Sequence, residues 1–161
     1  MTKNLKKSDL QGFTIIEVMI VLAVAAMILL IVLLAVPALQ RNSRNTAIKN
    51  DAASVAAGIN TYESDQNGIP PDTITSSSGT VTVGNTGAVC GTGSLTTKED
   101  IKVQGSTNVT CSGTAPSSAP DPGNIVVVPK KDCKDQPSTR AFAIYYSIET
   151  SGGTSQQCVD S

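Results

Sequence analysis

The sequence predicts an α+β protein, in which a long kinked N-terminal helix packs by its second half against a small antiparallel β-sheet head. Three observations predict this class. Nineteen consecutive residues, from Val18 to Val36, are apolar. An apolar stripe with helical spacing follows between residues 48 and 62. Residues 72–161 hold short β-favouring segments separated by Gly, Pro, Ser and Asn.

The apolar block predicts a transmembrane helix. In helical form it spans ~28 Å at ~1.5 Å per residue, close to the ~30 Å hydrocarbon core of a bilayer. An ordinary single-pass anchor, a secretory signal peptide cut near Ala38, and a buried core helix are the alternatives. The block exceeds the ~7–15 apolar residues of a signal peptide, and Pro37 fits poorly beside such a cut. The remaining chain is too small to enclose the block.

The charges that flank the block do not decide its orientation. Basic residues favour the cytoplasmic side of a membrane. Three of them precede the block and three follow it, namely Lys3, Lys6 and Lys7, then Arg41, Arg44 and Lys49. The direction of crossing therefore has to come from the identity of the leader.

The helix is expected to continue beyond the membrane, from about residue 14 to residue 64. Pro37 lacks an amide proton and predicts a kink. Asn67-Gly68 offers a C-terminal cap, and Pro70-Pro71 ends the run. The second half carries an amphipathic stripe that suits packing against a sheet, made of Ile48, Ala52, Val55, Ile59 and Tyr62. The first half must lie in lipid or among copies of itself, because ~97 residues fold into a domain of only ~13 Å radius of gyration.

The rest of the chain is predicted to form short strands. The final two are joined by Ser151-Gly152-Gly153-Thr154, which predicts an antiparallel hairpin. Phe142, Ile144, Tyr146 and Ile148 alternate and are expected to face the helix stripe. The expected strands cover residues 80–83, 101–103, 108–111, 125–128, 142–148 and 156–159.

Four cysteines, Cys90, Cys111, Cys133 and Cys158, predict two disulfides. No Cys-x-x-Cys pair and no His occurs, which argues against a zinc site. An even number of cysteines in a loop-rich domain beyond a membrane segment is typical of an oxidising compartment. Of the three pairings that four cysteines allow, proximity favours Cys90–Cys111 and Cys133–Cys158. The alternative is four buried free thiols.

Composition predicts neither a catalytic site nor a cofactor. The formal net charge of −1 gives no basic surface for nucleic acid. A chain without His has no Ser-His-Asp or Cys-His arrangement, and no Gly-Lys-Ser/Thr motif holds phosphate. Four carboxylates of the predicted head are expected in solvated loops, and the alternative is that they bind calcium. They are Glu99, Asp100, Asp132 and Asp135.

The N-terminus carries the most specific signal. Glu17 stands at the edge of the apolar block, either as an interfacial carboxylate or as a group that awaits a cation. The segment KKSDLQG, followed by FTIIEVMIV, resembles the class III leader of type IV prepilins. A short basic leader, Gly12 before the cut, Phe13 after it and Glu17 as fifth residue of the mature chain make up this resemblance.

The resemblance implies processing by a prepilin peptidase and N-methyltransferase, which cuts between Gly12 and Phe13 on the cytoplasmic face and methylates Phe13. Glu17 would pair with the Phe13 amine of a neighbouring subunit, which makes both residues part of assembly. The chain then consists of a leader (1–12), a transmembrane and filament-core helix (13–39), an amphipathic half-helix (40–68) and a β-rich extracellular head (69–161).

The resemblance also implies a function. We expect a structural subunit that lies in the lipid bilayer before assembly and forms a helical homopolymer outside the cell. An assembly ATPase and inner-membrane platform proteins would drive assembly, and such filaments serve adhesion, surface motility or DNA uptake. The alternatives are a pseudopilin of a type II secretion system and a monomeric membrane-anchored binding protein.

Overall fold

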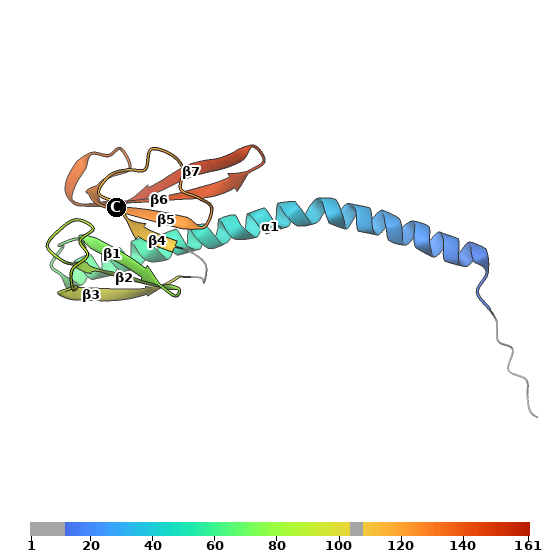
Figure 1. Ribbon diagram of the computed structural model, residues 1–161, viewed down its shortest axis with the longest axis horizontal. Helices are drawn as coiled ribbons and strands as arrows, with labels where there is room; N and C mark the ends of the chain where they lie inside the picture. Colours follow the sequence, from blue (N-terminus) through green and yellow to red (C-terminus); the bar gives the residue numbers. More distant parts are fainter. Residues whose placement is uncertain (1–11, 104–107) are drawn as a thin grey trace, which may run out of the picture. The chain divides into compact units, whose positions relative to one another are not determined.

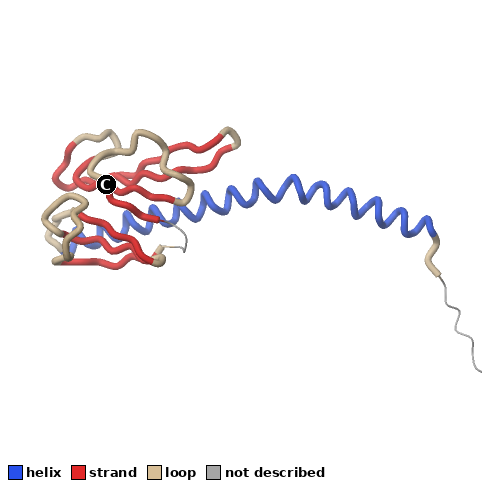
Figure 2. The backbone as a smooth tube through the Cα atoms, viewed as in Figure 1, coloured by secondary structure: helices blue, strands red, loops and turns tan. Residues whose placement is uncertain are grey.

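The computed structural model describes residues 12–103 and 108–161. These residues form one helix and seven strands, shown in Figures 1 and 2. The helix α1 runs from Ile15 to Asp65, and the strands follow it in the sequence. This confirms the predicted α+β class. The chain divides into two compact units between Leu39 and Gln40.

The first unit is the apolar part of α1. Within the described residues, α1 is the one helix long and apolar enough to cross a membrane, with a mean hydropathy of 3.3 in its most apolar window. None of that window is buried. Pro37 lies inside the helix, so one intrahelical hydrogen bond is missing there. The bend expected at Pro37 stays a prediction.

The second unit contains two sheets beside the polar half of α1. The first sheet has the order β1-β2-β3, and both of its pairings are antiparallel. The second has the order β4-β5-β6-β7. The strands of the first sheet are β1 (Thr73–Ser77), β2 (Thr80–Asn85) and β3 (Thr97–Lys102). Those of the second are β4 (Asn108–Cys111), β5 (Asn124–Lys131), β6 (Pro137–Thr150) and β7 (Gly153–Asp160).

The head differs in two ways from the single antiparallel sheet that the sequence predicts. It has two sheets, and β4 runs parallel to β5. A parallel pair needs a crossover of about a dozen residues, which the Pro-rich loop 112–123 supplies. Strand β1 is absent from the predicted strands because its sequence, TITSS, contains a single aliphatic residue.

The apolar stripe of α1 is the centre of the main core. Val55 and Ile59 are fully buried, and they cluster with residues of both sheets. Phe142, Ile144 and Tyr146 of β6 belong to this cluster, which confirms the predicted alternation. The opposite face of the second sheet carries a smaller cluster formed by Val128, Ala143 and Tyr145, against which Ala115 and the half-cystines Cys133 and Cys158 pack.

Gly58 allows α1 to approach β3 closely. A Cβ atom at this position would lie 2.2 Å from the Cδ1 atom of Ile101. Such a distance is far below van der Waals contact, so a larger residue would displace the Ile101 side chain. Glycine in a helix interior costs about 1 kcal/mol relative to alanine, and its presence here is explained by this contact.

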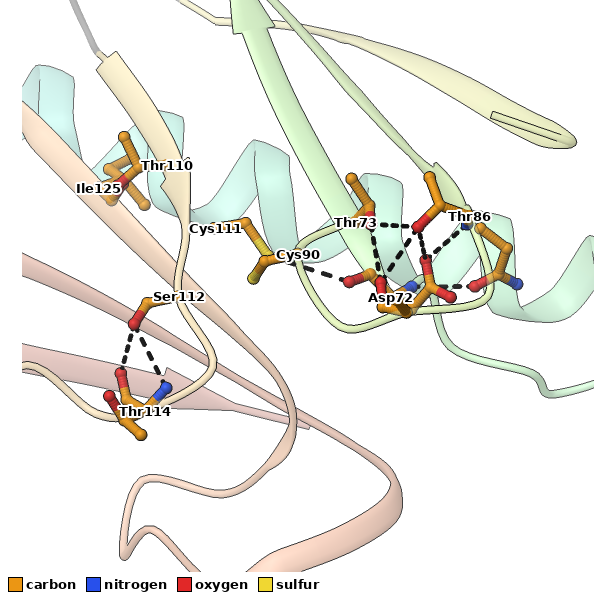
Figure 3. The surroundings of a disulfide bond; sticks show 11 residues. Asp72, Thr73, Thr86, Cys90, Thr110, Cys111, Ser112, Thr114 and Ile125 are labelled. Atoms are coloured by element: carbon orange, nitrogen blue, oxygen red, sulfur yellow. Dashed lines mark hydrogen bonds between the residues drawn. A yellow bond between two sulfur atoms is a disulfide. The ribbon is translucent and has the colours of Figure 1, made fainter. Parts of the chain in front are cut away.

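The two disulfides join Cys90 to Cys111 and Cys133 to Cys158, the pairing that proximity favours. The first links the loop after β2 to the end of β4, and so connects the two sheets (Figure 3). Beside it, the buried Asp72 carboxylate accepts hydrogen bonds from the Thr86 and Gly87 amides, both at 2.8 Å. The Asp72 carbonyl accepts a bond from the Cys90 amide at 2.7 Å.

Asn45 ties α1 to the end of β6 within the second unit. Its side-chain amide donates to the Glu149 carbonyl (2.8 Å) and accepts from the Glu149 amide (2.7 Å). These two bonds satisfy the backbone groups of Glu149 as a neighbouring strand would. Arg44 forms a bidentate pair with the Glu149 carboxylate, at 2.7 and 2.6 Å. The Arg44 bond lowers the pKa of Glu149.

We expect Asn45→Ala to destabilise the head more than Arg44→Ala does. Loss of Asn45 leaves two partly buried backbone groups unpaired, which costs about 1–3 kcal/mol. The Arg44 side chain is 57% exposed, so its ion pair is screened by solvent and contributes less. Urea denaturation of both variants measures the difference, and an equal or larger loss for Arg44→Ala contradicts this account.

The Glu63 carboxyl makes the stability of the head depend on pH. One oxygen of its carboxylate is buried without a hydrogen-bond partner. Burial raises the pKa of Glu63, and the charge of Arg140 partly offsets this. Because the pKa is higher in the folded than in the unfolded state, ionised Glu63 opposes folding at neutral pH.

We therefore expect Glu63→Gln to raise the melting temperature of the head at pH 7. The difference from wild type should vanish below about pH 4, where the Glu63 carboxyl is protonated in both folded and unfolded chains. Thermal melts of both proteins across this range measure it. A gain that stays constant down to low pH would show that charge is not the cause.

Candidate processing and assembly site

The candidate site residues Gly12, Phe13 and Glu17 lie at the start of the first unit. Gly12, Phe13 and Thr14 precede the helix, which begins at Ile15. Phe13 is 88% exposed, and among the described residues, chain neighbours aside, no atom lies within 4 Å of the position that a Gly12 Cβ would take. The bond between Gly12 and Phe13 is therefore open and lies outside the helix, as a peptidase substrate requires.

Thr14 and Glu17 form a capping box at the N-terminus of α1. The Thr14 amide and hydroxyl both donate to Oε2 of Glu17, at 2.9 and 2.8 Å. In return, the Glu17 amide donates to the Thr14 hydroxyl at 3.3 Å. This reciprocal arrangement satisfies backbone amides that have no partner inside the helix. The signal for it, Thr-x-x-Glu directly before an apolar run, is present in the sequence.

The capping box gives Glu17 a partner inside a single chain. Its carboxylate also lies at the positive end of the helix dipole, which favours a negative charge. An amine created at Phe13 would add a positive charge only one residue before Thr14, close to the same carboxylate in sequence. The structure thus supplies a resting position for Glu17, and pairing with a neighbouring amine would have to compete with it.

The surface of the first unit is apolar on all sides. Every residue from Phe13 to Gln40 is exposed, including large side chains such as Met27 at 67% and Leu34 at 75%. Soluble proteins rarely expose apolar patches of more than a few hundred Å². A helix that is apolar all round suits a membrane or the interior of an assembly. Glu17 is the one charged residue on this unit between Gly12 and Leu39.

The remaining candidates lie elsewhere in the fold. The four cysteines belong to the second unit, and Pro37 lies near the end of the first. Of the acidic groups expected in loops, Glu99 and Asp100 lie in β3, where Asp100 accepts a bond from the Thr82 hydroxyl at 2.6 Å. Asp132 and Asp135 lie in the turn after β5, as expected. The roles of Gly12, Phe13 and Glu17 in processing and assembly stay predictions.

A comparison with known protein families gives one match, at the N-terminal end of the chain. The family model for the prokaryotic N-terminal methylation motif matches residues 8–33. The match covers Gly12, Phe13, Thr14 and Glu17 and most of the apolar block. No curated protein and no solved structure matches the chain. The chain therefore carries the N-terminal methylation motif, which is the class III leader of type IV pilins and pseudopilins.

Proposed function

We propose that the chain is the structural subunit of a type IV pilus-like extracellular filament. The methylation motif carries this proposal, because it spans the start of an exposed apolar helix. The two disulfides in the second unit agree with a head outside the cytoplasm. Adhesion, surface motility and DNA uptake are the uses that such a filament serves.

Processing is the first step of this function. A prepilin peptidase and N-methyltransferase cuts between Gly12 and Phe13 on the cytoplasmic face and methylates the new Phe13 amine. Glycine has no Cβ, so the enzyme can approach the backbone closely there. Residues 1–12 are then cytoplasmic, residues 13–39 cross the membrane, and the half-helix (40–68) and head (69–161) lie outside.

Assembly transfers the apolar helix from lipid to the filament core. Lipid tails and neighbouring helices are both apolar surroundings for the helix. The charged groups therefore decide whether the helix is more stable in lipid or in the filament. An amine at Phe13 and the Glu17 carboxylate are each costly to bury alone, but they compensate one another when paired between neighbouring subunits. An assembly ATPase and platform proteins of the inner membrane supply the energy.

N-terminal sequencing of the protein from its host tests the cut. We expect the mature chain to begin with N-methylated Phe13, and Gly12→Val to leave the leader attached, because its branched side chain blocks close approach to the backbone. Ser8→Ala is the matched control and should be processed normally. A mature N-terminus at Met1 would favour a monomeric membrane-anchored binding protein, and one at Leu39 would favour a cleaved signal peptide.

A pseudopilin of a type II secretion system is the second candidate, because the same motif occurs in both groups. Electron microscopy of the cell surface separates the two. Long filaments that disappear on deletion of the protein support the pilus subunit. A secretion defect without loss of surface filaments supports the pseudopilin.

A further inference from the structure

We propose that Arg41 and Arg44 bind the phosphate group of an anionic membrane lipid, at the point where α1 leaves the bilayer. The proposal rests on the membrane crossing of the proposed function, and it needs neither the cut before Phe13 nor the filament. It gives the single subunit a partner before assembly, which the helix polymer does not supply. Both residues belong to the second unit, close to its start at Gln40.

The flank of the apolar block that lies outside the cell in this topology carries positive charge without a balancing acid on the helix. Basic residues favour the cytoplasmic side of a membrane, yet Arg41, Arg44 and Lys49 follow the block. Between Glu17 and Asp51 the sequence has no acidic residue. Cations beside a membrane segment are attracted to anionic lipids, which accounts for basic residues on this side.

Arg41 lies at the depth of the lipid headgroups. It is the fifth residue after Val36, the last residue of the apolar block, and α1 is helical throughout this stretch. Five residues advance a helix by ~7.5 Å, and the headgroup layer of each leaflet is ~5–7 Å thick. Helical side chains lean toward the N-terminus of their helix, so Arg41 can reach back among the phosphates. Lys49 lies ~12 Å further along the helix.

Both guanidinium groups have N–H donors left for a phosphate. An Arg side chain carries five such donors. Among the described residues, Arg41 uses Nη1 alone, in a bond of 3.4 Å to the Thr150 carbonyl. Arg44 uses Nε and Nη2 on the Glu149 carboxylate, which leaves its Nη1 open. Guanidinium groups bind phosphate through paired, charge-assisted hydrogen bonds, so this pair of side chains offers the donors that a phosphate needs.

The cluster keeps a positive charge after its ion pair is counted. The Arg44 hydrogen bond lowers the pKa of Glu149 most, and the charges of Arg44 and Arg41 lower it further. Two guanidinium groups thus act on one carboxylate, and one positive charge is in excess. The turn between β6 and β7, Ser151-Gly152, is exposed and uncharged. No acid of this turn opposes the approach of an anion.

Two features select a lipid as the source of this phosphate. The excess charge favours an anion, and the position directly after the membrane segment places the cluster among lipid phosphates. A lipid bound here would hold the apolar helix at a fixed depth until assembly removes it from the bilayer. Glu149 would compete with the phosphate for Arg44, because both anions use the same guanidinium group.

Native mass spectrometry of the full-length chain in detergent tests the site. The chain is mixed with equal amounts of phosphatidylglycerol, which is anionic, and phosphatidylcholine, which has no net charge. We expect several-fold more bound phosphatidylglycerol. One cation near an anionic surface favours binding by about fivefold, so Arg41→Gln should lower the ratio of the two lipids about fivefold. Equal binding of both lipids by the wild-type chain would overturn the proposal.

Lys49→Gln is the matched control, because it removes the same charge from the same helix. Lys49 lies ~12 Å beyond Arg41, further than the Debye length of ~10 Å at ~0.1 M salt. The lipid ratio of this variant should therefore stay at the wild-type value. An equal fall for Lys49→Gln and Arg41→Gln would show a general effect of net charge, and the site would be wrong.

Glu149→Gln gives a readout in the opposite direction. It removes the carboxylate that competes for Arg44, so the phosphatidylglycerol ratio should rise several-fold. A purely structural role of the ion pair predicts no rise, and an unchanged or lower ratio contradicts the proposal. Release of the lipid by an excess of inorganic phosphate would assign the cluster to a soluble anion instead.

Flotation of the chain with lipid vesicles separates this proposal from the proposed function. A chain that does not float with the vesicles lacks the membrane segment, and both proposals fail. A chain that floats but binds the two lipids equally keeps its proposed function and loses the lipid site. A chain that floats and prefers phosphatidylglycerol through Arg41 supports both.

Discussion

Glu17→Ala is expected to abolish filament assembly while the protein still inserts into the membrane and loses its leader. In the filament core, the Phe13 amine of a neighbour would be buried without its carboxylate, at a cost of about 3–5 kcal/mol per subunit. That cost lowers the equilibrium constant for adding each subunit by a factor of about 10² or more. Electron microscopy of sheared filaments gives the assembly readout, and immunoblots of membrane fractions give the insertion readout.

The capping box supplies the matched control for this variant. Glu17→Ala removes the hydrogen bonds from Thr14 as well as the charge, so loss of assembly could come from a frayed helix end. Glutamine at the same place can accept the bond from the Thr14 amide, because capping boxes use either Glu or Gln. Glu17→Gln therefore keeps the cap and loses the charge. Normal filaments from Glu17→Gln would disprove the charge pairing, whereas the same loss as in Glu17→Ala supports it.

The sequence predicts those parts of the fold whose signals are local. The stripe of Ile48, Val55 and Ile59 repeats with helical period, and the structure buries it. Strand β4 has the predicted bounds, because the residues that flank it in the sequence do not favour a strand. The alternation in β6 also predicts which face meets the helix. Each of these properties depends on residues close together in the chain.

The antiparallel hairpin of β6 and β7 is confirmed, because its turn is a local signal. The other strand neighbours were the part that sequence patterns did not predict. The parallel direction of β4 and β5 follows from the path of loop 112–123, which has no periodic signal. The first sheet was not predicted as a separate sheet, because its strand β1, with a single aliphatic residue, was missed. The position of β7 at an edge of the second sheet follows from the same pairings.

For the candidate site, the sequence predicts the residues and the structure adds the contacts of one of them. Gly12, Phe13 and Glu17 are predicted from a short motif. They lie within residues 8–33, which the methylation-motif model matches, and their roles stay predictions. What the motif does not describe is the competition at Glu17, whose carboxylate is engaged by Thr14 in the single chain. A local motif thus predicts the site, whereas the hydrogen bonds of its charged group come from the structure.

Phe142→Ala is expected to destabilise the head strongly without affecting the membrane helix. The Phe142 side chain is 2% exposed and lies in the core cluster that the helix stripe forms with both sheets. Truncation of a buried Phe to Ala costs about 3–5 kcal/mol, a large part of the ~5–15 kcal/mol that keeps a domain folded. Val159→Ala, on the exposed part of β7, is the control and should cost under about 1 kcal/mol.

Denaturant unfolding of the purified chain measures the Phe142→Ala loss, and N-terminal sequencing measures its processing. We expect a much lower unfolding midpoint with a normal cut before Phe13, because the cut depends on residues of the first unit alone. Glu17→Ala should show the reverse, a normal midpoint without filaments. If Phe142→Ala also blocked the cut, the processing step would depend on the folded head, and the separation of the two units in function would be wrong.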